Sequence, residues 1–120
     1  MSAYHQIFVR TAEPPETLLA DLTELCDAPL KRIDDGPVDY ASHTPTAFID
    51  VELHHDFDPD RDMPFDQYPF LVTIRDRERD QERQQHAAQE VFDALAATGR
   101  YRLMLVHDLQ RMLATYPPAA

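Results

Sequence analysis

Residues 47–54 read Ala-Phe-Ile-Asp-Val-Glu-Leu-His, and residues 68–75 read Tyr-Pro-Phe-Leu-Val-Thr-Ile-Arg. In both stretches every second residue is apolar, and in the first the residues between them are mostly polar, which is typical of a half-buried β-strand. The intervening residues 58–66 read Asp-Pro-Asp-Arg-Asp-Met-Pro-Phe-Asp and cannot continue either strand, because prolines and charges interrupt the pattern. We therefore expect the two strands to pair as a hairpin with a long acidic loop.

Four further elements are predicted on either side of this hairpin. Short apolar runs predict strands at residues 3–10 and 101–106. Apolar residues recur at every third or fourth position in residues 14–27 and in the later part of residues 79–98. This spacing predicts two helices, each with one apolar face.

The C-terminal segment and one short inner segment remain. Asp108 is expected to cap a short final helix that carries Leu109, Met112 and Leu113 and ends before Pro117. Residues 30–35 can be read either as a loop or as an additional strand.

The order β-α-β-β-α-β predicts an α+β fold, namely a ferredoxin-like two-layer sandwich with an antiparallel sheet and both helices on one face. A long acidic hairpin loop and a short C-terminal helix complete this expectation. The alternative is another two-layer α+β arrangement in which residues 30–35 add a fifth strand. One domain over residues 1–116 is expected, followed by a tail at 117–120. The sheet face away from the helices should display Phe48, Asp50, Glu52 and His54.

Charge limits the possible partners. The chain has 120 residues, 22 acidic and 11 basic side chains, and a net charge of −11. Residues 46–66 alone carry seven acidic residues and one basic residue. A field this negative opposes direct binding to nucleic-acid phosphates and to anionic membranes. One cysteine and an N-terminus unlike a signal peptide predict a cytoplasmic protein, and the preference for arginine over lysine predicts a bacterial one.

The acidic loop has some features of a metal site. Carboxylates at residues 56, 58, 60 and 62 resemble the start of an EF-hand calcium loop. That loop needs glycine at its sixth position and glutamate at its twelfth, where this chain has Arg61 and Gln67. A transition metal held by His54, Asp56 and Asp50 is the other metal hypothesis. We expect neither, because aspartates in such a loop are more often simply solvated.

Catalytic constellations are weak. His86 shares a helical stripe with Glu82 and Glu90, which is typical of an exposed salt-bridged face. Cys26 continues an apolar stripe and is expected to be structural. The two glycines do not form a phosphate-binding loop. We predict no catalytic residue, no resident metal and no cofactor.

The sequence therefore predicts a small acidic binding protein that neutralises or sequesters a basic protein partner, as an immunity protein or an inhibitor does. Aspartates on a rigid hairpin would speed association with a basic surface. The predicted partner-binding residues are Asp50, Glu52, His54, Asp56, Asp58, Asp60 and Asp62. The alternative hypothesis is a homodimer that binds a small ligand or a metal, as a binding protein or a small enzyme, with His54, Tyr68 and His107 in its cleft.

Overall fold

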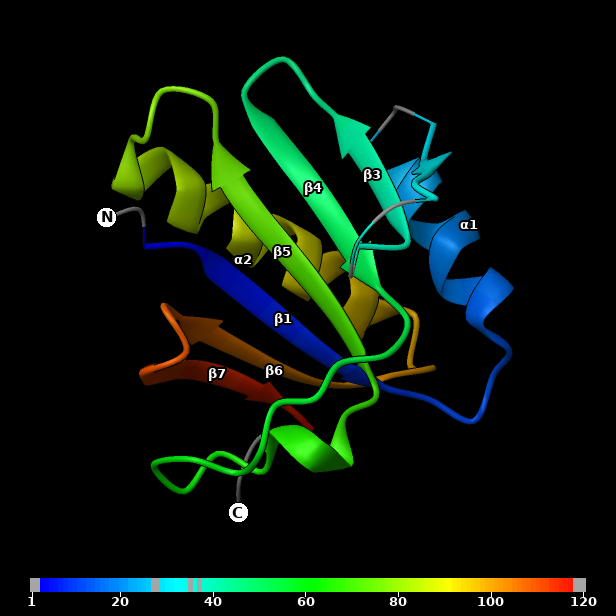
Figure 1. The fold of residues 1–120 in the computed structure, drawn as a ribbon, viewed down its shortest axis with the longest axis vertical. Coiled ribbons are helices and arrows are strands. Elements are labelled where there is room, and N and C mark those ends of the chain that lie inside the picture. Colours follow the sequence, from blue (N-terminus) through cyan, green and yellow to red (C-terminus); the bar gives the residue numbers. More distant parts are fainter. Residues whose placement is uncertain (1–2, 27–28, 35, 37, 118–120) are drawn as a thin grey trace.

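A computed structural model describes residues 3–26, 29–34, 36 and 38–117. Within these residues, one seven-stranded antiparallel sheet has the strand order β2-β3-β4-β5-β1-β6-β7, and two helices lie behind it in Figure 1. The strands are β1 (His5–Arg10), β2 (Lys31–Arg32), β3 (Tyr40–His43), β4 (Ala47–Glu52), β5 (Phe70–Asp76), β6 (Arg102–His107) and β7 (Arg111–Tyr116). The helices are α1 (Pro15–Cys26) and α2 (Gln81–Ala97), and a 3-10 turn, η1, spans Phe65–Gln67.

The main core lies between the helices and the sheet. Alternation along the strands directs every second side chain toward the helices, as with Ile49 and Val51 of β4. Leu22 of α1 and Phe92 and Leu95 of α2 pack against this face and are at most 5% exposed. None of the described helices is both long enough and apolar enough to cross a membrane.

A second, smaller core lies on the opposite face of the sheet. The segment between β4 and β5 folds back over this face (Figure 1) and contributes buried Met63 and Phe65. The ring of Phe65 stacks on that of Phe8 with centroids 4.5 Å apart. Through Met63 and Phe65 this segment covers β1, β6 and part of β5, while residues 56–62 remain exposed. The cluster comprises Phe8, Met63, Phe65, Leu71, Met104 and Val106.

The predicted ferredoxin-like βαββαβ sandwich with a short C-terminal helix is wrong. The sheet has seven strands, and residues 111–116 form β7, paired with β6. Asp108 does not cap a helix. Asp108 and Leu109 adopt positive φ angles of 54° and 57°, and this tight turn reverses the chain after β6. Leu113, Ala114 and Tyr116 of β7 are partly buried and pack against the main core, whereas Met112 is 40% exposed.

Other predicted boundaries also differ. Lys31–Arg32 within the ambiguous segment 30–35 form β2, which pairs with β3; Asp35 lies outside the described residues. The helix expected over 14–27 ends at Cys26, and Asp27 lies outside the described residues. The expected tail 117–120 is described only at its first residue.

Candidate functional site

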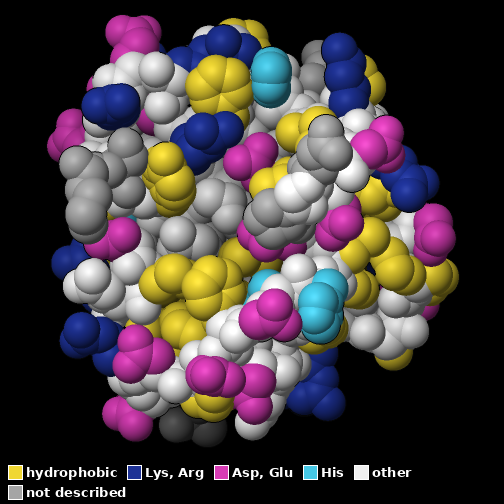
Figure 2. All heavy atoms as spheres, in the orientation of Figure 1, with side chains coloured by type: hydrophobic (Ala, Val, Ile, Leu, Met, Phe, Trp, Pro, Cys, Tyr) yellow, Lys and Arg dark blue, Asp and Glu magenta, His cyan; other side chains and the backbone are white. Residues whose placement is uncertain are grey.

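Part of the second sheet face stays uncovered, over β3, β4 and the end of β5. Asp50 and Glu52 lie on this face because they alternate with buried Ile49 and Val51. Both carboxylates are partly buried. Figure 2 shows acidic, apolar and histidine side chains interspersed over this side of the molecule. The sequence predicted an uncovered face that displays Phe48, Asp50, Glu52 and His54, and the first three alternate with the buried residues of β4.

Arg75 of β5 lies on this face beside Asp50 and Phe48. Its Nη2 lies 3.4 Å from Oδ2 of Asp50, and its guanidinium lies 5.0 Å from the ring centroid of Phe48. The Nε of Arg75 is buried and has no hydrogen-bond partner among the described residues. Burial raises the pKa of Asp50, while the charges of Arg75 and His43 lower it; the net change is upward. The ion pair therefore offsets only part of the desolvation cost of this carboxylate.

Glu52 has no such basic partner within the part of the chain that the structure describes. Burial raises its pKa, and the negative charges of Asp39 and Asp50 raise it further. Asp39 is fixed beside it, because its Oδ2 accepts a 2.7 Å hydrogen bond from the backbone N–H of Leu53. A cation that binds between two such like-charged carboxylates stabilises the ionised form of both.

Next to Glu52 the surface is hollowed into a pocket that has two adjoining parts.

 The two parts measure about 670 Å³ and 460 Å³. A separate hollow of about 480 Å³ lies on α2, beside Glu82 and His86. We call the 670 Å³ part the acidic pocket; it is lined by Asp39, Glu52, His54, His55, Asp56 and Phe57. The 460 Å³ part shares the last four of these residues and adds Asp58, Asp66 and Pro69. No lysine or arginine lines either part among the described residues.

The wall of the acidic pocket is anchored to the sheet. Nε2 of His55 donates a hydrogen bond to the carbonyl oxygen of Tyr68, and its Nδ1 accepts one from the backbone N–H of Phe57. The His55 ring also meets Phe8 of the second core edge-on, with centroids 5.2 Å apart. His54 is exposed instead, with Nε2 3.3 Å from Oδ1 of Asp56. The contacts of His55 with Tyr68, Phe57 and Phe8 therefore hold this wall of the pocket in place before a ligand binds.

The structure brings together some of the predicted partner-binding residues. Glu52, His54 and Asp56 line the acidic pocket, Asp50 lies beside Glu52 on the face above, and Asp58 lines the adjoining part.

Asp60 and Asp62 line neither part of the pocket. Asp60 forms two backbone hydrogen bonds with Met63, of 3.1 and 2.7 Å. Between them Arg61 and Asp62 have positive φ angles of 49° and 66°. These two aspartates belong to a tight turn at the end of the segment.

The residues of the alternative hypothesis do not share one cleft. Tyr68 packs against the second core, while His107 lies on the helix side, where its Nε2 is 3.0 Å from Oε1 of Gln81. Within the described ranges, no group of three or more histidine, cysteine or acidic side chains is placed to hold a metal ion. Cys26 is partly buried, and burial raises the pKa of its thiol.

Sequence reasoning missed three contributors to this site. Asp39 is brought to Glu52 by pairing of β3 with β4, since the N–H of Asp39 donates to the carbonyl of Val51. His55 and Phe57 are placed by packing against Phe8. One signal was available: apolar Phe57, Met63 and Phe65 in an otherwise acidic segment indicate that the segment packs on something.

Comparison with known proteins adds no relative: no family model matches the chain, and no curated protein and no solved structure matches it.

Proposed function

We propose that this protein binds a basic protein partner, and so neutralises or sequesters it, by receiving a lysine or arginine side chain in the acidic pocket. The observation that carries the proposal is Glu52, a partly buried carboxylate whose pKa is raised by burial and by two neighbouring carboxylates. Ionised at neutral pH, this group remains uncompensated until a cation arrives.

The pocket supplies both parts of a site for a long basic side chain. Asp39, Glu52 and Asp56 offer carboxylates. Phe57 is 38% exposed and offers an apolar surface for the aliphatic stem of lysine or arginine. Its ring meets those of Phe8 and Phe65 edge-on, each with centroids 6.2 Å apart. A surface held in this way loses little conformational entropy on binding.

The net charge of −11 supports the same partner chemistry. A field of one sign attracts a basic protein before contact and raises the association rate, with less effect on the final packing. Local pocket contacts and long-range attraction therefore make separable contributions, and the experiment must distinguish them.

The test is titration of the full chain with an acetylated tri-arginine peptide, followed by heteronuclear NMR, with a tri-glutamate peptide for comparison. We expect saturable shifts at Glu52, Asp56 and Phe57 with tri-arginine alone. The double variant Glu52→Gln/Asp56→Asn should weaken binding by about tenfold, equivalent to about 1.4 kcal/mol.

The matched control is Asp60→Asn/Asp62→Asn, which removes the same charge from the tight turn outside the pocket. We expect it to weaken binding by no more than about threefold, since only long-range attraction is lost. Equal losses in the two double variants would show that net charge alone attracts the peptide and would reject the pocket.

A further inference from the structure

Two arginines lie directly opposite each other where β1 ends and β6 begins. Arg10 and Arg102 are cross-strand partners, and both are exposed. Like charges directly opposite each other destabilise an antiparallel pair. Neither guanidinium has a carboxylate within 4.0 Å among the described residues, where the ion pairs of arginine involve Arg32, Arg61, Arg75, Arg83 and Arg100. The chain has 22 acidic side chains, so a lack of acidic residues does not explain why these two arginines have no carboxylate partner among the described residues.

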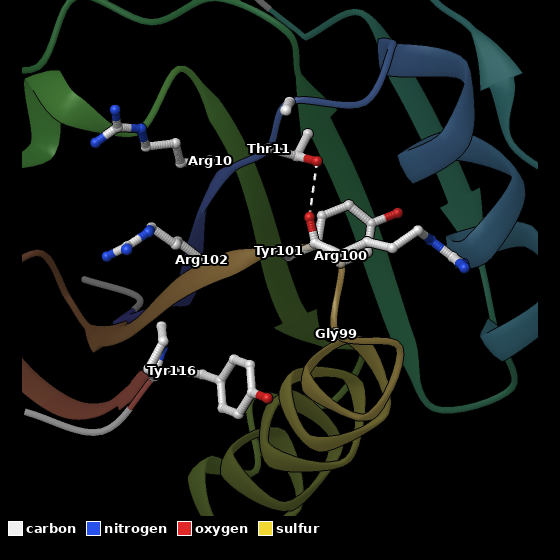
Figure 3. A pocket seen from close by; sticks show the side chains of 9 residues that line it. Arg10, Thr11, Gly99, Arg100, Tyr101, Arg102 and Tyr116 are labelled. Carbon is white, nitrogen blue, oxygen red and sulfur yellow. Dashed lines mark hydrogen bonds between the residues drawn. The ribbon is translucent and has the colours of Figure 1, made fainter.

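A pocket of about 540 Å³ adjoins this pair. Figure 3 shows the side chains of Arg10 and Arg102 extending in the same direction from neighbouring strands. None of the described residues that line this pocket is acidic, and we call it the arginine pocket. Its lining residues are Arg10, Thr11, Ala12, Gly99, Arg100, Tyr101, Arg102, Tyr116 and Pro117.

The nearby carboxylate of Asp21 is already engaged. Arg100 Nη2 lies 2.8 Å from each of its oxygens, and the Tyr101 hydroxyl donates to Oδ2. Burial opposes ionisation of Asp21, but these hydrogen bonds outweigh it and lower its pKa. Asp21 is therefore committed to Arg100 and Tyr101, and the two positive charges of Arg10 and Arg102 stay available to an external anion.

We propose that Arg10 and Arg102 bind the phosphate group of a small phosphomonoester. A phosphate dianion matches two adjacent positive charges, and the planar guanidinium donates paired hydrogen bonds to its oxygens. The adjoining pocket has a volume of about 540 Å³, which falls within the usual size of small-molecule sites, so a small organic group attached to the phosphate has room beside the two arginines. This site is separate from the acidic pocket and goes beyond the proposed function.

The experiment is NMR titration of the full chain with inorganic phosphate, glycerol 3-phosphate and acetate at about 0.15 M ionic strength. We expect saturable shifts of the Nε–H signals of Arg10 and Arg102 with both phosphates, with a Kd on the order of 1 mM. Glycerol 3-phosphate should bind at least as tightly as inorganic phosphate, and acetate about tenfold more weakly because it carries one charge.

Arg10→Gln/Arg102→Gln should reduce the affinity for glycerol 3-phosphate by at least about tenfold. The control Arg32→Gln/Arg79→Gln removes the same charge elsewhere and should change it by less than about twofold. Arg10→Lys/Arg102→Lys keeps the charge and provides a second variant if the glutamine pair does not fold; it should still weaken binding, since the paired hydrogen bonds are lost. Absence of saturable shifts at both arginines, equal losses in the test and control pairs, or acetate binding as tightly as phosphate would overturn the proposal.

Discussion

The acidic pocket and the arginine pocket lie at the same end of the sheet, but the carboxylate in the first and the carboxylate beside the second have neighbours of opposite charge. β1 and β4 run in the same direction, because each is antiparallel to β5 between them, so Arg10 and Glu52 mark the same sheet end. The pKa of Glu52 is raised by burial and by its acidic neighbours, whereas the pKa of Asp21, beside the arginine pocket, is lowered by its partners despite burial. The charge of the neighbours, rather than burial alone, decides whether a carboxylate stabilises this fold.

The largest expected effect comes from separating the acidic pocket from the sheet. Phe65→Ala removes a ring that is 2% exposed and stacked on Phe8. We expect a loss of about 3–5 kcal/mol in the free energy of unfolding, as for other buried aromatics, measured by denaturant titration. The NMR signals of residues 54–58 should shift, while those around Arg10 and Arg102 should hardly change. Equal shifts at both pockets would contradict an independently packed segment.

Acid should weaken the packing of α2 on the start of β1, away from both pockets. His5 is 1% exposed, and burial, with smaller effects of His107 and Arg111, lowers its pKa to about 4. Gln84 Nε2 donates a 2.7 Å hydrogen bond to Nδ1 of His5, so this nitrogen is an acceptor and the ring is neutral. The unfolded chain takes up its proton near pH 6.5, earlier than the folded one.

Through His5, stability should therefore fall by up to about 3 kcal/mol between about pH 6.5 and pH 4. Denaturant titrations across this range test the effect. His5→Gln should flatten this part of the pH profile, whereas His86→Gln, at an exposed histidine paired with Glu90, should leave it unchanged. A profile that His5→Gln does not alter would assign the acid response to other groups.

Beside the arginine pocket, removal of a carboxylate should destabilise the fold. Asp21→Ala breaks the hydrogen bonds from Arg100 and Tyr101 that join α1 to the start of β6. A loss of about 2 kcal/mol is expected at pH 7, since hydrogen bonds to charged groups contribute this much. Thermal or denaturant unfolding measures it, with Asp62→Ala as a comparison at an exposed acid. A change below about 0.5 kcal/mol would place Asp21 among ordinary surface residues.

In the acidic pocket the same kind of change should have the opposite sign. Glu52→Gln removes a carboxylate that lies close to Asp39 and Asp50. We expect the free energy of unfolding at pH 7 to rise by about 0.2–1 kcal/mol, the range for like-charged neighbours on a sheet. Because the folded-state pKa of Glu52 is raised, this gain should shrink as the pH falls and the wild-type group is protonated. A loss of stability would contradict the repulsion.

The two regions also differ in how far sequence reasoning could reach. Acidic residues 50–62 are close in sequence and visible as a block, so three of the six residues that line the acidic pocket, Glu52, His54 and Asp56, were among the predicted binding residues. Arg10 and Arg102 become neighbours only through the register of β1 with β6, which no local pattern specifies. Packing of residues 53–69 on the sheet was missed, although Ile-Phe-Val at 7–9 and Leu-Met-Leu-Val at 103–106 are apolar on both faces, which indicates a sheet covered on both sides.

β7 was missed for a local reason. Leu109, Met112 and Leu113 have helical spacing, and the turn before them contains neither glycine nor asparagine, the residues that usually mark left-handed positions. Pairing with β6 outweighed the local preference. The element types of the other strongly periodic segments were predicted correctly because each buries one face against a large core.

The order of the strands has a consequence for how the molecule responds to salt. At about 4.8 Å per strand, β4 lies roughly 10 Å from β1 and roughly 14 Å from β6. These separations exceed the Debye length of about 8 Å at physiological ionic strength, so each pocket presents its own sign to an approaching ion. In dilute buffer the Debye length grows to about 30 Å, and the whole molecule then acts as one anion. Added salt should thus weaken the binding of a cationic ligand at every concentration. It should at first strengthen the binding of a phosphate, because it screens the distant carboxylates.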